Sequence, residues 1–331
     1  MSVGDPVTQL QTGADRSAAR DRRREDAVRR HRTPLPTRMR REWRMYALIL
    51  PGLLFFVLFA YVPIFGNVVA FQAFSPFLGI EGSPWVGFEN FSRILGDPEV
   101  GRAVVNTIQI ALLQIVFSFP APILLALLLN SLLSSRIKRI VQSVVYLPHF
   151  ISWVIVISIW QQILGGAGPV AGLFESIGID GVNIMSNPDT FKLLVTSQVI
   201  WKDIGWGTII FFAAIAAIPQ ELYEAAAVDG AKPWRQMWHV TLPGLVPVIS
   251  LLLVLTVGNV LTVGFEQLLL QQPIVGADAA QVIDTFVYFR GVVGGDWGIS
   301  AAAGLIKGII GTLLVLGANR LAKRMGTEGV L

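Results

Sequence analysis

Residues 46–71 read YALILPGLLFFVLFAYVPIFGNVVAF, a run of 26 residues without a charged side chain. A helix of that length rises about 39 Å at ~1.5 Å per residue, enough to cross the hydrocarbon core of a bilayer. The run is too long for the apolar region of a signal peptide, and no A-x-A cleavage site follows it closely. We therefore expect it to remain in place as a membrane anchor.

The whole chain has the composition of a membrane protein. Of its 331 residues, 53% are hydrophobic and 15% are charged, whereas soluble domains average about 25% charged residues. Backbone groups in lipid must pair internally, so long apolar segments are expected to be helices. The predicted fold is all-α, a polytopic membrane protein with six transmembrane helices at approximately 46–71, 104–132, 139–164, 193–218, 244–269 and 299–319.

Lysine and arginine are distributed unevenly between the two sides of these predicted helices. The N-terminal tail holds twelve arginines against six acidic residues, and the second and fourth connections and the C-terminus also carry lysine or arginine. The other three loops hold four basic and ten acidic residues. By the positive-inside rule, both termini are predicted to lie in the cytoplasm, with the chain in the plasma or inner membrane of the cell.

The first 44 residues are rich in arginine and lack an apolar periodicity. This pattern is typical of a disordered cytoplasmic tail. A nucleic-acid-binding arm is the alternative interpretation, but aromatic residues are not interleaved with the arginines. We predict no nucleic-acid partner.

The connection 219–243 is a polar loop that predicts two short helices. Pro219 suits the first turn of a helix, and Gly230 suits the point where the chain leaves it. Pro233 can open a second helix, and Pro243 is expected to end that helix before the next span. The loop would then form a helix, a glycine elbow and a second helix.

Two interpretations of this loop follow from its side chains. An amphipathic helix pair resting among lipid headgroups is the first, and it would make membrane lipid a partner. Such helices favour lysine and arginine, whereas this loop carries Glu221, Glu224 and Asp229. The acidic residues favour the second interpretation, a docking surface for a soluble partner.

The loop holds the triplet EAA, a glycine four residues after its last alanine, and a Leu-Pro pair about a dozen residues on; these are Glu224, Ala225, Ala226, Gly230, Leu242 and Pro243. It resembles the EAA loop of the permease subunits of binding-protein-dependent ABC importers. Four further stretches resemble the polysaccharide- or oligosaccharide-type branch of the carbohydrate permeases, at 61–91, 144–156, 201–214 and 282–291. The resemblance runs from about residue 44 to the C-terminus.

The resemblance implies a type I ABC importer permease that works within a complex. Its partners would be a second permease in a heterodimer, two cytoplasmic ATP-binding subunits, an extracellular solute-binding protein and a sugar substrate. ATP would be hydrolysed by the partner subunits, so this chain would be no enzyme and would need no cofactor. The substrate would be an oligosaccharide or a polysaccharide fragment.

The resemblance also implies roles for individual residues and a division of the chain. Glu224 would contact basic groups of the ATPase, Ala225 and Ala226 would permit close packing, and Gly230 would form the elbow. Asp229, Leu242 and Pro243 complete the predicted docking set. The expected regions are a tail, a first helix with an extracellular loop, a core domain and a C-terminal tail, at 1–44, 45–102, 103–320 and 321–331.

Charged residues inside the spans are the candidates for a translocation pathway. Lys202 lies about ten residues into the fourth predicted span, or ~15 Å along a helix, and Asp203 is adjacent. Such charges usually face a protein interior or a watery cavity. The predicted pathway residues are Trp201, Lys202, Asp203, Trp206, Asn259 and Glu266. Salt bridges between helices are the alternative for Lys202 and Asp203, and ordinary solvation is the alternative for Glu266.

No catalytic constellation is found in the sequence. None of the lysines is followed by serine or threonine, so the chain has no P-loop, and the three histidines are far apart. The absence of cysteine excludes thiolate metal sites, and we predict no metal site. A secondary transporter or channel for a polar solute is the alternative function, although it would not require a cytoplasmic docking loop and no inverted repeat is evident.

Overall fold

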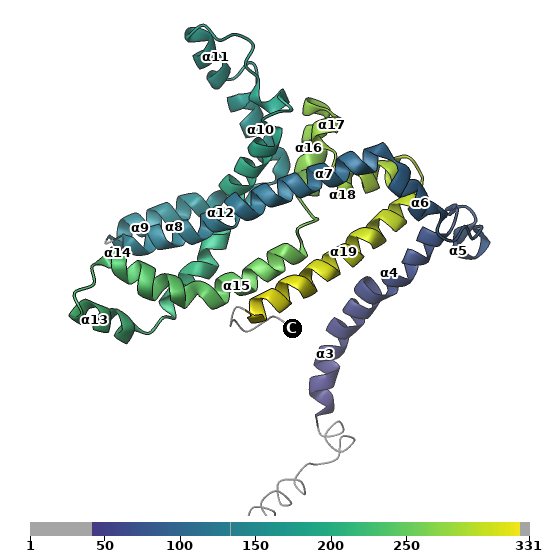
Figure 1. Cartoon of the computed structure of the whole chain (residues 1–331). Coiled ribbons are helices and arrows are strands. Elements are labelled where there is room, and N and C mark those ends of the chain that lie inside the picture. The colour runs from purple at the N-terminus through teal and green to yellow at the C-terminus, as the bar shows by residue number, and fades with distance from the viewer. Residues whose placement is uncertain (1–41, 133, 325–331) are drawn as a thin grey trace, which may run out of the picture. The chain divides into compact units, whose positions relative to one another are not determined.

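The computed structural model describes residues 42–132 and 134–324, and Figure 1 shows that they are built from helices. These residues include no strand, and Gln72 and Trp85 form an isolated antiparallel bridge. The predicted all-α class is confirmed. The chain divides into two compact units, residues 1–66 and residues 67–331. Of the predicted tails 1–44 and 321–331, residues 1–41 and 325–331 lie outside the described residues.

The first unit contains α3 (Trp43–Phe56), the π turn η1 (Val57–Tyr61) and α4 (Val62–Phe65). The second unit begins within the 3₁₀ turn η2 (Gly66–Phe71). Its longer elements are α6 (Glu89–Gly96), α7 (Pro98–Leu113), the π turn η3 (Gln114–Ser118), α8 (Pro120–Ser131), α9 (Ser135–Tyr146), α10 (Trp153–Leu164), α11 (Pro169–Ser176), α12 (Phe191–Ala216), α13 (Gln220–Val228), α15 (Leu242–Gly258), α16 (Phe265–Val275) and α19 (Trp297–Arg324). Short elements join them: α5 (Gly79–Gly82), η4 (Leu147–Phe150), η5 (Ile184–Ser186), α14 (Pro233–Gln236), the π turn η6 (Met237–Thr241), α17 (Ala277–Ala280), α18 (Ile283–Val287) and the π turn η7 (Tyr288–Val293).

Six helical segments of the described chain are long and apolar enough to cross a membrane, as predicted; they are Trp43–Phe71, Pro98–Ser131, Trp153–Ser176, Phe191–Ala216, Pro233–Gly258 and Trp297–Arg324. The first, second, fourth and sixth agree with the predicted spans to within six residues at either end. The third and fifth do not, and proline chemistry accounts for much of both differences.

The predicted third span, 139–164, was wrong as a single helix. It breaks between α9 and α10, where η4 contains Pro148, which has no N–H to donate and disfavours helical geometry in the preceding residue. Ser152 then begins α10 afresh, because its Oγ accepts the N–H of Ile155 at 3.5 Å. As Figure 1 shows, α9 packs along α12 whereas α10 leads away to α11 and α16.

Three prolines inside the other spans each follow a π turn. η1, η3 and η6 each end two residues before a proline, namely Pro63, Pro120 and Pro243. A proline ring clashes with the carbonyl four residues earlier in an α-helix. In these turns the N–H groups of Val62, Phe119 and Leu242 instead bond the carbonyl five residues earlier, which widens the helix ahead of the proline.

The fifth span therefore runs without interruption through Pro243. The prediction that this proline ends the second loop helix was wrong, because α14, η6 and α15 form one helix from Pro233 to Gly258. The predicted span 244–269 also extended too far. Asn259 caps α15, the chain turns at Gly264 with φ of +80°, and α16 starts a separate helix.

Three buried clusters hold the second unit together. The first joins α7, α10, α12, α16 and α17, the second joins α6, α7, α18 and α19, and the third joins α8, α12 and α15. Between α12 and α16, three glutamines with no exposed surface exchange side-chain hydrogen bonds of 2.7–3.1 Å: Gln198, Gln267 and Gln271. Polar side chains bonded across helices in this way stabilise contacts that apolar surface alone does not favour in lipid.

Ion pairs tie α7 to the segments around η7 and α19. Asp97 caps α7 by accepting the N–H of Glu99 at 2.9 Å, and it also accepts a hydrogen bond from Arg290 at 2.9 Å. Arg93 bonds Asp296 at 3.1 Å in the same region. Burial acts to raise the pKa of Asp97, but the Arg290 and Glu99 hydrogen bonds outweigh it and hold the pKa below its usual value.

This lowered pKa predicts that acid weakens the α7 cap. Because the folded pKa lies below the unfolded value, Asp97 stabilises the fold above about pH 4 and loses that effect as the pH falls through the folded pKa. We expect Asp97→Ala to lower the free energy of unfolding by about 1 kcal/mol at neutral pH. Its melting temperature should also fall less on acidification than that of the wild type. The exposed Asp180→Ala is the control, and equal acid sensitivity of wild type and Asp97→Ala would contradict the assignment.

Candidate functional site

The loop 219–243 has the predicted helix–glycine–helix shape. Pro219 stands just before α13 as its N-cap, and Gly230 has φ of +73°, a conformation that favours glycine. The N–H of Ala231 bonds the Ala226 carbonyl at 2.9 Å, and the N–H of Gly230 bonds the Ala227 carbonyl at 3.0 Å. This pair of bonds is a Schellman ending, so the elbow is fixed by the local sequence.

The loop presents both acidic and apolar side chains to its surroundings. Glu224, Ala225, Asp229, Gly230 and Pro243 are exposed, whereas Ala226 and Leu242 are half-buried. Val228 is 89% exposed and Trp234 is 68% exposed. α13 is held to η6 by a 3.0 Å hydrogen bond between Tyr223 and Thr241. A surface of this kind, with acids beside uncovered apolar groups on a fixed backbone, suits docking to another protein.

An apolar groove of about 490 Å³ lies where α12, α13 and η6 meet. Leu222 of α13 lines it together with Pro219, Pro243 and Gly244. A displacement of α13 would therefore act on the ends of both α12 and α15. The predicted docking residues thus sit on the connection between the fourth and fifth spans, except for Leu242 and Pro243, which lie within the fifth span.

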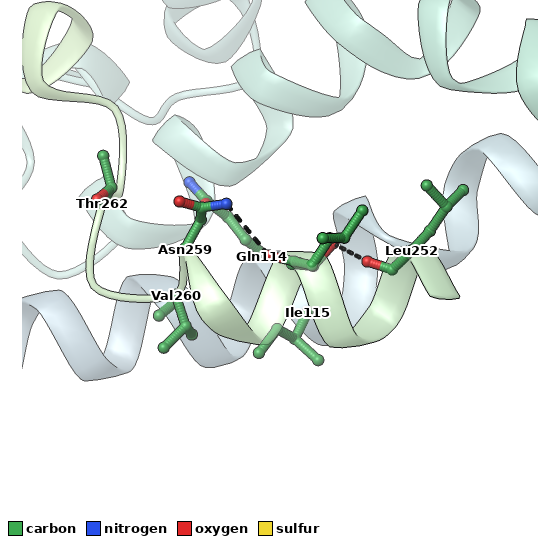
Figure 2. A pocket seen from close by; sticks show the side chains of 9 residues that line it. Gln114, Ile115, Leu252, Asn259, Val260 and Thr262 are labelled. Atoms are coloured by element: carbon green, nitrogen blue, oxygen red, sulfur yellow. Dashed lines mark hydrogen bonds between the residues drawn. The ribbon is translucent and has the colours of Figure 1, made fainter. Parts of the chain in front are cut away.

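A second groove, of about 330 Å³, lies between the α7–η3 segment and α15. Figure 2 shows Gln114 and Asn259 lining it from these two segments. Thr256 and Thr262 add two hydroxyl groups, and the other lining residues are apolar. The neutral amides and hydroxyls in this groove can donate and accept hydrogen bonds with a polyhydroxylated ligand.

A neighbouring groove of about 280 Å³ continues this surface toward α8 and α12. The two grooves share Gln114, Leu252 and Thr256, and the second adds Ser118 and Gly207. The Ser118 hydroxyl is buried and has no hydrogen-bond partner within the described residues. Together the two grooves form a continuous surface, here called the polar groove. Gln114 and Ser118 line it from η3, Thr256 lines it from α15, and Asn259 lines it from the C-cap of α15.

Four of the predicted pathway residues lie together on α12. Lys202 is only 8% exposed and donates to backbone carbonyls of the break between α9 and α10. Asp203 bonds His149 at 2.8 Å, and the rings of Trp206 and His149 stack with centroids 4.5 Å apart. Trp201 meets Trp160 edge to face. Lys202 and Asp203 therefore bond elements around the break and do not form a salt bridge with each other.

Asn259 and Glu266 are separated by the turn that ends α15. Asn259 lines the polar groove, whereas Glu266 is exposed on α16 and lines none of the three grooves described above. Sequence reasoning missed Gln114, Ser118 and Thr256. Their spacing carried a signal. Gln114 and Ser118 are four residues apart, and Thr256 precedes Asn259 by three, and both intervals place polar side chains on one helix face. No group of histidine, aspartate or glutamate in the described residues could hold a metal ion.

Comparison with known proteins identifies relatives along most of the chain. A family described as "Binding-protein-dependent transport system inner membrane component" matches residues 118–327. Protein LplB of Bacillus subtilis (strain 168) is 41% identical over 293 residues, which cover 88% of this chain and 92% of that protein. The polygalacturonan/rhamnogalacturonan transport system permease protein YteP of the same organism is 44% identical, covering 86% of this chain and 89% of its own length.

Solved structures agree with these relatives. A chain in the crystal structure of a bacterial ABC transporter involved in the import of the acidic polysaccharide alginate is 38% identical, with a TM-score of 0.81. The match covers 88% of this chain and 98% of that chain. A second crystal structure holds the bacterial alginate ABC transporter in complex with an alginate pentasaccharide-bound periplasmic protein, and its matching chain is 37% identical with a TM-score of 0.82, covering 89% of this chain and 99% of that chain.

Proposed function

This chain belongs to the inner-membrane components of binding-protein-dependent transport systems, and from that premise we propose that it forms half of the sugar pathway of an ATP-driven importer. It is a multi-pass membrane permease with six candidate spans. The alternative of a secondary transporter or channel is not favoured, because the family and the two solved relatives are parts of ABC importers.

The polar groove is the observation that carries the pathway proposal. It brings Gln114, Ser118, Thr256, Asn259 and Thr262 to one surface of helices that are otherwise apolar. Neutral donors and acceptors of this kind suit the hydroxyl groups of a saccharide. The names of the relatives supply the substrate class, since YteP is a polygalacturonan and rhamnogalacturonan permease and the solved relative imports alginate. The proposed substrate is an oligosaccharide or a polysaccharide fragment.

The loop 219–243 is proposed to couple the pathway to a separate ATPase. Glu224 would meet basic groups of that subunit, and Ala225 and Ala226 would allow α13 to pack closely against it. The groove lined by Leu222, Pro219 and Pro243 supports this role, because a residue of α13 faces it together with residues from the ends of two spans. Asp229, Gly230 and Leu242 complete the proposed docking set.

The proposed assembly places the loop and both termini in the cytoplasm. Basic residues concentrate on the side that holds the loop, which supports this orientation. The other partners are a second permease in a heterodimer, two ATP-binding subunits and an extracellular solute-binding protein. The chain would use no cofactor of its own, and ATP would be hydrolysed by its partners.

Transport in proteoliposomes tests the proposal. The chain would be reconstituted with its neighbouring permease, ATPase and binding proteins, and offered a labelled alginate pentasaccharide and a labelled galacturonate oligomer. We expect accumulation of whichever sugar the binding protein retains, only with ATP and the binding protein, and unaffected by an ionophore that collapses the proton gradient. Accumulation driven by a proton gradient without ATP would refute the importer.

A further inference from the structure

The break between α9 and α10 leaves backbone carbonyls without helical partners. α9 ends at Tyr146, η4 covers the next four residues, and α10 begins at Trp153. The last carbonyls of a helix receive no N–H from within that helix, and they carry partial negative charge. Inside a membrane, water cannot satisfy them freely, so another group must do so.

The ammonium group of Lys202 occupies this position. Its Nζ lies 2.7 Å from the His149 carbonyl, 2.7 Å from the Ile151 carbonyl and 3.5 Å from the Pro148 carbonyl. An ammonium group has three N–H donors. Two serve the His149 and Ile151 carbonyls, and the third reaches the Pro148 carbonyl, which also accepts the N–H of Ile151 at 3.1 Å. The positive charge also sits at the negative end of the α9–η4 segment and 5.6 Å from the Trp153 ring.

Residues of α12 next to Lys202 also contact the same break. Asp203 bonds the Nδ1 of His149 at 2.8 Å, and Trp206 stacks on that ring at an interplanar angle of 6°. Gly205 lets the backbones approach so closely that a Cβ there would lie 2.0 Å from the Val145 carbonyl oxygen. Residues 202–206 therefore fix both the backbone and the side chain of His149.

We propose that Lys202 is a positioning residue that caps the carbonyls of the α9–α10 break. This cap, here called the latch, holds the break against α12 and thereby keeps the His149–Trp206 stack in place. This inference rests on the proposed transport function, since it assigns the stack to the importer's moving core. Lys202 does not contact the sugar, because no N–H of its ammonium remains for a hydroxyl or a carboxylate. The direction of α10, which leads to α11 and α16, depends on the same cap.

Cysteine cross-linking tests the latch without any substrate. The chain has no cysteine, so Phe150→Cys with Trp206→Cys places one reporter thiol on η4 and one on α12, at two side chains that are in ring contact. The pair replaces the Trp206 ring, so it reports the position of η4 against α12 and not the ring stack itself. The pair would be oxidised in the assembled importer in lipid nanodiscs, in four backgrounds: wild type, Lys202→Met, Lys202→Arg and Lys192→Met. Lys192 is the matched control, since it lies on the same helix but bonds Gln109 at an exposed site.

We expect Lys202→Met to slow cross-linking about tenfold, because the His149 and Ile151 carbonyls lose their donor. Lys202→Arg keeps the charge and several donors and should retain most of the rate, and Lys192→Met should match the wild type. Cross-linking of Lys202→Met at the wild-type rate would overturn the latch. If Lys202→Arg lost as much of the cross-linking rate as Lys202→Met, the capping role would be overturned, because the shape of the lysine side chain and not its N–H donors would then hold the break.

Uptake of the sugar retained by the binding protein separates this inference from the proposed function. With Trp206 and Phe150 unchanged, Lys202→Met should lower the maximal uptake rate and leave the half-saturating sugar concentration unchanged. A shift in that concentration with normal cross-linking would mean that Lys202 contacts the sugar, contrary to the inference. No uptake by the wild type would count against the importer, while the cross-linking result would still decide the latch.

Discussion

Glu224→Ala is expected to lower ATP-driven sugar uptake by ~30-fold or more, because removing one partner of a docked charge pair leaves the other charge buried and unpaired. The folded chain should be unaffected. Glu224 is exposed on α13, and substitutions at exposed helix positions change stability little. The two expectations together distinguish a docking residue from a structural one.

Gly230→Val should have the same effect on uptake by another route. Nothing lies within 4 Å of a Cβ at this position, but the φ of +73° is unfavourable for a side chain. We expect a strain of about 1–2 kcal/mol, which the chain relieves by opening the elbow between α13 and α14. The loop would then present its helices at the wrong angle while the spans stay intact.

Co-purification and uptake check both variants together. The amount of ATPase retained by each detergent-solubilised variant would be compared with its transport rate in proteoliposomes. Glu175→Ala is the control, an exposed glutamate at the end of α11. Normal ATPase retention and normal uptake in both Glu224→Ala and Gly230→Val would refute the coupling role of the loop.

The double variant Gln114→Leu with Asn259→Leu is expected to reduce uptake about 100-fold without loss of the ATPase. Each leucine removes a donor and an acceptor from the polar groove, and each unmet hydrogen bond to a desolvated sugar costs roughly 1–3 kcal/mol. Asn259 is exposed and Gln114 is half-buried, so the fold tolerates apolar groups there. This result is the converse of the loop variants, with docking intact and the pathway impaired.

Glu266→Gln is the matched control for the groove. Glu266 was predicted to belong to the pathway, but it lies on α16 and lines none of the described grooves. We expect its uptake to equal that of the wild type. Full uptake by the double leucine variant, or loss of uptake in Glu266→Gln alone, would move the pathway elsewhere.

The backbone shape of the loop 219–243 could be predicted in detail because its signals are local. Pro219 and Gly230 fix the ends of α13 through backbone geometry that depends on the residues beside them. Hydropathy likewise predicted the number of spans and the place of four of them, since length and apolar content decide membrane crossing. Pro243 was misjudged because a π turn lets a helix continue through a proline, and hydropathy carries no signal for such a turn.

The polar groove could not be predicted to the same degree, because it depends on contacts between distant segments. Lys202 was predicted as a pathway candidate, with salt bridges between helices as the alternative. Its acceptors are carbonyls about fifty residues earlier, at a break that the apolar pattern does not reveal. Gln114 and Thr256 carry no charge and did not stand out among apolar neighbours. Their common groove emerges only when η3 packs beside α15.

Accessibility of a single cysteine at position 228 tests the orientation on which the coupling account depends. Val228 is 89% exposed beside the elbow, and the chain has no other cysteine to react. With Val228→Cys, a membrane-impermeant maleimide should label inside-out vesicles stripped of the ATPase, and adding the ATPase back should block that labelling. Intact cells should stay unlabelled. Labelling from outside intact cells would contradict the account, because the loop would then lie on the side of the membrane where no ATPase can reach it.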